Sequence, residues 1–349
     1  MMRKYIIESV KYWIQEYHLD GFRFDLMGIH DIKTMNMVSE ELHKIDPTLF
    51  IYGEGWTAGG SPLVAEKQAL KRNANKLKNV AVFSDDIRDG IKGSWNKHQD
   101  RGFASGKANL EESMKFGITA ATQHPQVNYQ KVNYSKAPYS KEPFQTINYV
   151  SCHDNHTLWD KLQESVKKTN PKTTEEELIK MHLLANTIVL TSQGVAFLHA
   201  GVDFLRTKRG VENSFESPDE INQIDWGRKW KYRKVFEFYQ KLIQLRKQHP
   251  AFRMTSSAQI QKYLQFLKVE VPNVVAYHLT NNANGDQWKD ILVVFNGNRS
   301  NQVLEIPSLA KSKWMVALQG QNIYLQGKTW SGDNKLRIEG SSAMILFRK

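Results

Sequence analysis

The sequence DGFRFDLMG occupies residues 20–28, and within it apolar and charged side chains alternate strictly. Because successive side chains of a β-strand point to opposite faces, Phe22 and Phe24 share one face, and Arg23 and Asp25 share the other. A strand buried in a parallel sheet is normally apolar on both faces. Buried charges are costly unless they are paired or bind a ligand. The charged face therefore indicates either an internal Arg23–Asp25 ion pair or a ligand site.

Two further strand ends carry acidic residues. The motif IYGEGW places Glu54 between two glycines at the end of an apolar run, and Trp56 follows as a flat surface for a ring-shaped ligand. We interpret the glycines as allowing a tight turn and the approach of a ligand. The motif YVSCHDNHTLWD places His153 and Asp154 where another strand ends. Each motif alone also fits a structural role, because isolated Glu residues and His–Asp pairs are common at surfaces.

Strand and helix patterns alternate up to about residue 250, which predicts a parallel α/β sheet. Five strand signals lie near residues 22, 51, 82, 148 and 197, and helices are expected at 3–18, 32–45, 61–72, 175–192 and 228–249. The segments 94–112 and 122–145 are expected to be long loops, which in compact domains are usually functional or disordered.

The pattern changes after Pro250, where short strands are separated by Asn, Gly and Ser turns. This predicts an antiparallel β-sandwich, with its first strand at 259–268. We therefore expect two domains: residues 1–251 form the α/β part, and residues 252–349 form the β-sandwich.

The strand ends suggest a chemistry when they are taken together. In a (β/α) barrel the carboxyl ends of the strands meet at one face, where active sites lie. Three carboxylates in one pocket acquire different pKa values, and glycoside cleavage uses one ionised nucleophile and one protonated acid. Arg23 beside Asp25 favours Asp25 as the nucleophile, and Glu54 is then the acid/base. Asp154 would stabilise the oxocarbenium-like transition state, and His153 would donate to the same sugar ring.

At this point the sequence resembles a known family. DGFRFDLMG, YGEGW and VSCHDN resemble three of the four signature segments of the α-amylase superfamily of retaining glycosidases. RGFASG, QTINYVSCHDNHTLWDKL and FLRTKRGVENSFESPDEINQIDW are similar to segments of type I pullulanases, the α-1,6 debranching enzymes. The resemblance covers nearly the whole chain, although Cys152 and His156 stand where the family usually shows Lys and Gln. It implies the same roles for the three acids, and substrate contacts from Arg23, His153, Trp56, Asn155, Trp159 and the segment 213–226.

An eight-stranded barrel needs more strands than the five signals found here. The first signature segment of the family is not found in this sequence. We therefore expect an incomplete (β/α)8 TIM barrel, comprising about the last five strands, followed by the all-β sandwich. The missing N-terminal part of the barrel is an expected partner, and the chain alone is expected to be poorly soluble or inactive.

The resemblance implies hydrolysis of α-1,6-glucosidic linkages in pullulan, starch or glycogen-type α-glucans by a retaining mechanism. Two alternatives stay open: a truncated, non-catalytic α-glucan-binding remnant, and another branch-point enzyme of the isoamylase or branching type. All the branch-point enzymes use the same catalytic triad, so only product analysis separates them.

Composition excludes several other classes. A single cysteine rules out a disulfide framework, and no apolar run approaches the roughly 18 residues of a membrane span. The net charge of +12 is dispersed, which disfavours a nucleic-acid partner. The first residues read as an amphipathic helix and not as a signal peptide, so a cytoplasmic and a secreted location both stay open.

No cofactor is expected from the sequence. Some members of the superfamily hold calcium, but part of the usual ligand set would come from the missing N-terminal segment. Asp85, Asp86 and Asp89 lie close together, and we expect them to begin a helix, where acidic groups favour the positive end of the dipole.

Overall fold

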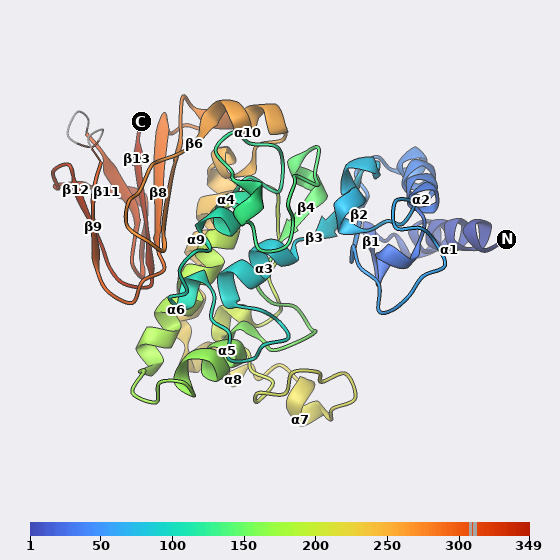
Figure 1. Cartoon of the computed structure of the whole chain (residues 1–349), viewed down its shortest axis with the longest axis horizontal. Coiled ribbons are helices and arrows are strands. Elements are labelled where there is room, and N and C mark those ends of the chain that lie inside the picture. Colours follow the sequence, from blue (N-terminus) through green and yellow to red (C-terminus); the bar gives the residue numbers. More distant parts are fainter. Residues whose placement is uncertain (307–308, 310–312) are drawn as a thin grey trace.

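The structure is a computed structural model that describes residues 1–306, 309 and 313–349. Parallel strands and helices alternate in the first 250 residues, and antiparallel strands make up most of the rest. In Figure 1, β1, β2, α1 and α2 lie at one end of the molecule, the C-terminal sheets lie at the other, and α6 and α9 lie between them. Within the described ranges no helix is both long and apolar enough to span a membrane.

The parallel strands form one sheet in the order β1-β2-β3-β4-β5. They are β1 (Gly21–Phe24), β2 (Phe50–Gly53), β3 (Val80–Phe83), β4 (Thr146–Asn148) and β5 (Val195–Ala196). Because every pair is parallel, all five carboxyl ends lie at the same edge of the sheet. The predicted parallel α/β sheet is confirmed at all five strand signals, whereas its place in an incomplete (β/α)8 barrel stays a prediction.

Helices cover and connect these strands. They are α1 (Met2–Tyr17), α2 (Ile32–Ile45), α3 (Asp85–Lys92), α4 (Glu111–Ile118), α5 (Leu158–Leu162), α6 (Glu175–Thr191), α7 (Asp219–Asn222), α8 (Gly227–Lys231), α9 (Arg233–Gln248) and α10 (Ser257–Tyr263). Local sequence fixes several helix starts. Asp31 caps α2 by accepting from the Thr34 amide at 2.8 Å, and Thr174 and Glu177 form a capping box at the start of α6.

The C-terminal strands form a six-stranded sheet, β11-β10-β13-β8-β7-β6, and a two-stranded sheet, β12-β9. Their bounds are β6 (Leu264–Phe266), β7 (Val274–Leu279), β8 (Asp290–Asn296), β9 (Gln302–Glu305), β10 (Met315–Gln319), β11 (Asn322–Thr329), β12 (Lys335–Ile338) and β13 (Ser342–Arg348). All pairings are antiparallel, and Leu304, Leu336 and Leu346 lie in one apolar cluster between the two sheets. The predicted antiparallel β region is confirmed.

The two parts of the molecule share a core. One apolar cluster extends from Ile7 on α1 to Phe347 on β13. Tyr277 on β7 donates a hydrogen bond to the carbonyl of Thr191 at the end of α6, at 2.8 Å. The predicted boundary between residues 251 and 252 therefore separates a parallel from an antiparallel region, and the two regions pack on one another. That this boundary divides two domains stays a prediction.

Two predicted elements are wrong. Residues 61–70 form bends and turns and not a helix, and a 3-10 helix begins only at Lys71. The backbone of this segment pairs with the segment 30–32: Ile32 N donates to Lys67 O at 2.9 Å, and Ala69 N donates to His30 O at 2.9 Å. The first half of the predicted strand at 259–268 belongs to the helix α10, which Ser256 caps, and only β6 follows as a strand.

Candidate active site

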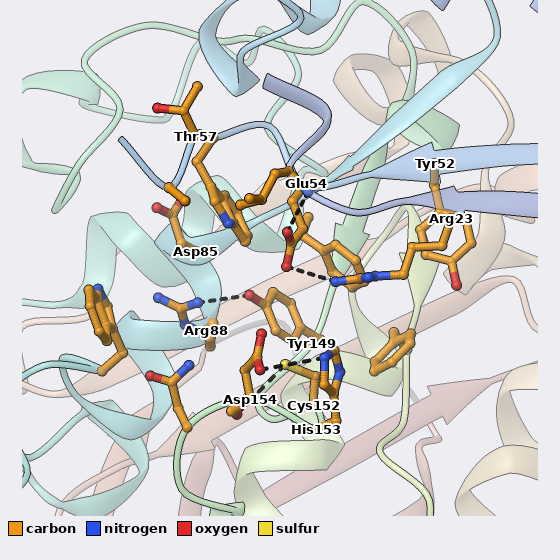
Figure 2. Close-up of a pocket in the computed structure, with 17 residues that line it drawn as sticks. Arg23, Tyr52, Glu54, Thr57, Asp85, Arg88, Tyr149, Cys152, His153 and Asp154 are labelled. Carbon is orange, nitrogen blue, oxygen red and sulfur yellow. Dashed lines mark hydrogen bonds and ion pairs between the residues drawn. The ribbon is translucent and has the colours of Figure 1, made fainter. Parts of the chain in front are cut away.

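A cavity of ≈ 690 Å³ lies at the carboxyl ends of the parallel strands, and Figure 2 shows its walls. Side chains reach it from β1, from the segments after β2, β3 and β4, and from the residue that follows β5. Six of the predicted site residues line it: Arg23, Glu54, Trp56, His153, Asp154 and Asn155. The structure therefore brings three separate sequence motifs to one hollow.

Arg23 connects the first two motifs. Its Nη1 donates to Asp25 Oδ1 at 2.8 Å, and its Nη2 donates to Glu54 Oε1 at 2.7 Å (Figure 2 shows the second contact). Burial lowers the pKa of Arg23, but the hydrogen bond to Asp25 and the charges of Glu54 and Asp25 outweigh burial and hold the pKa above its usual value. Arg23 is therefore a fixed cation between two carboxylates. The predicted Arg23–Asp25 ion pair is confirmed, and the ligand site stays a prediction for the cavity that Arg23 lines.

Glu54 is held rigidly at the end of β2. Its side chain is 8% exposed, and Oε2 accepts a hydrogen bond from the Leu26 amide at 2.8 Å. The neighbouring glycines serve packing: a Cβ at Gly53 would lie 2.6 Å from Phe24 O, and a Cβ at Gly55 would lie 2.5 Å from Lys71 N. The interpretation that these glycines admit a ligand is wrong, because the backbone of neighbouring segments fills the space.

Two predicted residues do not line the cavity. The Asp25 side chain is 69% exposed and is tied to the cavity only through Arg23. Trp159 is buried in the core, where its ring packs against His182 and Tyr232. The substrate contact that the resemblance implied for Trp159 is wrong, because all five residues of α5 are buried and the ring lies in the core. The segment 213–226 also contributes no side chain to the cavity wall.

The loop after β4 presents His153 and Asp154. Their side chains are 66% and 47% exposed, and His153 Nε2 lies 3.5 Å from Asp154 Oδ1. Lys208 Nζ supports this loop by donating to His153 O at 3.0 Å. Cys152 lies beneath, and burial raises the pKa of its thiol, with Lys92 acting in the opposite direction. His153 and Asp154 are therefore accessible to a ligand, and the Lys208 hydrogen bond holds the backbone that carries them.

Sequence reasoning missed the wall that follows β3. Asp85 and Arg88 of α3 line the cavity, and Arg88 donates to Tyr149 Oη at 2.9 Å. The rings of Phe83 and Tyr149 pack together in the floor, with centroids 4.9 Å apart. Phe83 and Tyr149 lie at the carboxyl ends of β3 and β4, and that position could have identified them as cavity residues. The apolar sequence of these strands, however, does not indicate which face of the strand lines a cavity.

Asp85 and Asp86 begin α3 as expected. Lys71 contacts both carboxylates, at 2.7 Å for Asp86 Oδ2. Burial raises the pKa of Asp85, and the charge of Lys71 opposes that rise. Among residues 1–306, 309 and 313–349, no group of three His, Cys, Asp or Glu side chains is arranged to hold a metal ion.

Comparison with known proteins gives consistent matches. A family model described as the all-beta domain of pullulanase matches residues 260–322. The pullulanase of Bacillus subtilis (strain 168) is 38% identical over 308 residues, which are 88% of this chain and 41% of that protein.

Solved structures agree. The crystal structure of type I pullulanase from Bacillus subtilis str. 168 complexed with maltose matches 99% of this chain and 46% of that chain, with a TM-score of 0.89 and 34% identity. The pullulanase from Paenibacillus barengoltzii in complex with maltohexaose and alpha-cyclodextrin matches 99% of this chain and 50% of that chain, with a TM-score of 0.88 and 41% identity.

The parallel sheet carries a cavity with charged walls at its carboxyl edge, in a chain that is similar to pullulanases over most of its own length. More narrowly, the chain is homologous to the C-terminal region of type I pullulanases. It spans about two fifths of the length of the Bacillus subtilis relative.

Proposed function

We propose that this chain carries the catalytic acids of an enzyme that hydrolyses α-1,6-glucosidic linkages in pullulan and related branched α-glucans by a retaining mechanism. The observation that carries the proposal is the cavity that Glu54 and Asp154 share, together with the Arg23 bridge from Glu54 to Asp25. The homology to pullulanases supports the substrate class.

The surroundings of the acids suit different roles. Glu54 is buried, and two donors fix its carboxyl group at a defined position, which suits an acid/base that exchanges a proton with the scissile oxygen. Asp25 is exposed and pairs with a cation, which suits an ionised nucleophile. Asp154 lies in the wall with a half-exposed carboxylate that can meet developing positive charge on the sugar.

Three further residues would bind the reacting sugar. Arg23 and His153 offer N–H donors to its hydroxyls, and Trp56 offers an apolar face. For the nucleophile, the proposal makes a specific demand: the exposed Asp25 carboxylate must point into the cavity when the glucan is bound. Substrate hydroxyls that take over contacts of Arg23 would allow that rotation.

The experiment is incubation of the chain with pullulan, followed by chromatography of the products. Release of maltotriose by the chain would support the proposal and overturn the expectation that the chain alone is inactive, and both Asp25→Asn and Glu54→Gln should abolish that release. Asp20→Asn is a matched control, because Asp20 is an exposed acid at the opposite end of the same strand, β1. Products of transglycosylation, or cleavage confined to isoamylase-type substrates, would point to another branch-point enzyme.

A second function is favoured by one observation, the position of Asp25 outside the cavity wall. A cavity with aromatic and polar walls but without its nucleophile would bind α-glucan and leave it intact. Affinity electrophoresis in gels that contain pullulan separates the two functions. Retarded migration that is unchanged in Asp25→Asn and Glu54→Gln, with no hydrolysis by the wild type, would favour binding alone.

A further inference from the structure

The ammonium group of Lys161 lies in a cage of main-chain carbonyls. Lys161 is 1% exposed, and its Nζ donates to Ser94 O at 2.8 Å, Lys97 O at 2.6 Å and His98 O at 3.0 Å. An ammonium has three N–H donors, so the cage satisfies all of them. All three acceptors belong to one exposed loop between α3 and α4, and this cation is therefore the internal anchor of that loop.

The anchored loop carries one side chain to the cavity. Trp95 lines the wall and is 47% exposed, and its neighbour Ser94 supplies one of the three carbonyls. The loop has a second anchor at Asp100, which accepts from the Ser94 amide at 3.0 Å. The Trp95 amide itself donates to Asp89 Oδ2 at 3.4 Å, so Lys161, Asp100 and Asp89 together hold the backbone that carries Trp95.

The helix that carries Lys161 is itself held in place. It belongs to α5, which follows the loop of Asp154. The adjacent Asp160 accepts from the Lys208 amide at 2.7 Å and from Thr157 Oγ1 at 2.9 Å. These hydrogen bonds connect α5 to the segments after β4 and β5. Lys161 in turn connects α5 to the loop that carries Trp95.

We propose that Lys161 is a positioning residue that holds Trp95 as a platform for a glucose ring in the cavity. An exposed indole face packs well against the apolar C–H face of a sugar, and the indole Nε1–H can donate a hydrogen bond to a sugar hydroxyl. The inference rests on the proposed α-glucan substrate, and it adds a sugar contact that none of the predicted site residues supplies.

Charged groups around the cage set its response to pH. The pKa of Lys161 is lowered to about 8, chiefly by burial and also by the charge of Lys107. Asp100 of the loop, Asp89 of α3 and Glu212 of the segment after β5 act in the opposite direction. Above about pH 8 the neutral amine has two N–H donors, and one carbonyl of the cage loses its partner.

The first test follows Trp95 directly and does not depend on activity. In the full chain labelled with fluorotryptophan, Trp95→Phe identifies the fluorine resonance of Trp95. We expect Lys161→Met to shift or broaden that resonance and Lys161→Arg to restore it in part. Lys167→Met is the matched control, because Lys167 also donates to main-chain carbonyls, those of Pro171 and Thr173, away from the cavity.

The second test is a double-mutant cycle on pullulan hydrolysis. Trp95→Ala should raise KM roughly fivefold with little change in kcat, as expected for one lost stacking contact. Lys161→Met should raise KM similarly. Because Lys161 acts through Trp95, the double variant should be no worse than Trp95→Ala alone. Effects that multiply, or an unchanged KM in Trp95→Ala, would overturn the inference.

Two outcomes separate this inference from the proposed function. If the wild type hydrolyses no α-glucan but binds maltotriose several-fold more tightly than Trp95→Ala in calorimetry, hydrolysis fails and the platform stands. Equal binding overturns the platform. If Lys161→Met does not fold, the Trp95 resonance of the wild type is followed into alkaline pH. A shift with a midpoint near pH 8 supports the anchor, and a constant resonance contradicts it.

Discussion

The guanidinium of Arg23 on β1 lies 2.7 Å from the carboxylate of Glu54, the residue that follows the neighbouring strand β2. The same guanidinium holds Asp25, so one cation joins a buried acid to an exposed one. Two carboxyl groups in contrasting surroundings are what acid/base and nucleophilic roles require. The proposed mechanism depends on this contrast.

Replacement of Arg23 by Met should lower kcat/KM for pullulan roughly 10- to 100-fold, because charge-assisted hydrogen bonds to both acids are lost. Arg23→Lys should recover part of the activity through one contact. Steady-state kinetics test this prediction. Arg3→Met is the control, since Arg3 pairs with Asp31 outside the cavity and its loss should leave kcat/KM unchanged.

The thiol of Cys152 should react slowly. Burial raises its pKa above the ordinary 9.0, so little thiolate forms near neutral pH. We expect alkylation by iodoacetamide to be at least about tenfold slower in the folded chain than in the unfolded chain. Added α-glucan should slow it further, because Cys152 lines the cavity. Mass spectrometry of timed samples measures both rates, and equal rates in the two states would contradict the burial argument.

Arg246 should be a strong contributor to stability. It is 9% exposed, and its guanidinium donates to the carbonyls of Leu190, Ser192, Gly194 and Phe252. Arg246→Met would leave these acceptors unpaired, at about 1–3 kcal/mol for each one that stays buried. We expect the free energy of unfolding in urea to fall by at least about 3 kcal/mol. The neighbouring exposed Lys247, changed to Met, should leave it nearly unchanged.

The KM of the wild type should rise above about pH 8, because neutral Lys161 releases one carbonyl of the Trp95 loop. The contribution of Lys161 to the free energy of unfolding should, in contrast, become more favourable to the folded state over the same pH range. The folded pKa lies below the ordinary value of 10.5, so the unfolded chain binds more protons between these values, and this lysine then favours folding increasingly as pH rises. Parallel pH profiles of KM and unfolding for the wild type and Lys161→Met test both signs. If KM still rises at alkaline pH in Lys161→Met, titration of Lys161 is not the cause of that rise.

Much of the fold followed from periodicity. The alternation in β1 predicted that Phe22 and Phe24 share one face and Arg23 lies on the other. In the structure both phenylalanines pack against the core, and Arg23 lines the cavity. Helical spacing in α1 was also recognised, but the buried face is Ile7, Val10 and Ile14, whereas Trp13 is 42% exposed. A periodic pattern identifies a helix better than it identifies the neighbour that the helix will meet.

The failures have local causes. The strand β12 (KLRI) gives only a weak pattern, because two of its four residues are charged, although Leu336 and Ile338 are buried against the larger sheet. The role of Lys161 could not be predicted from the sequence, because its three acceptors are carbonyls more than sixty residues away. Strand ends could be predicted to meet, but not the rotation of Asp25 out of the cavity wall.

The most direct measurement of the central claim is trapping of the glycosyl-enzyme intermediate with a fluorinated α-maltosyl substrate, followed by peptide mass spectrometry. A retaining enzyme forms a covalent bond between the sugar and its nucleophile. The account predicts one sugar adduct, on the peptide that contains Asp25, and none in Asp25→Asn. An adduct on the peptide of Glu54 or Asp154, or hydrolysis with inversion and no adduct, would contradict it.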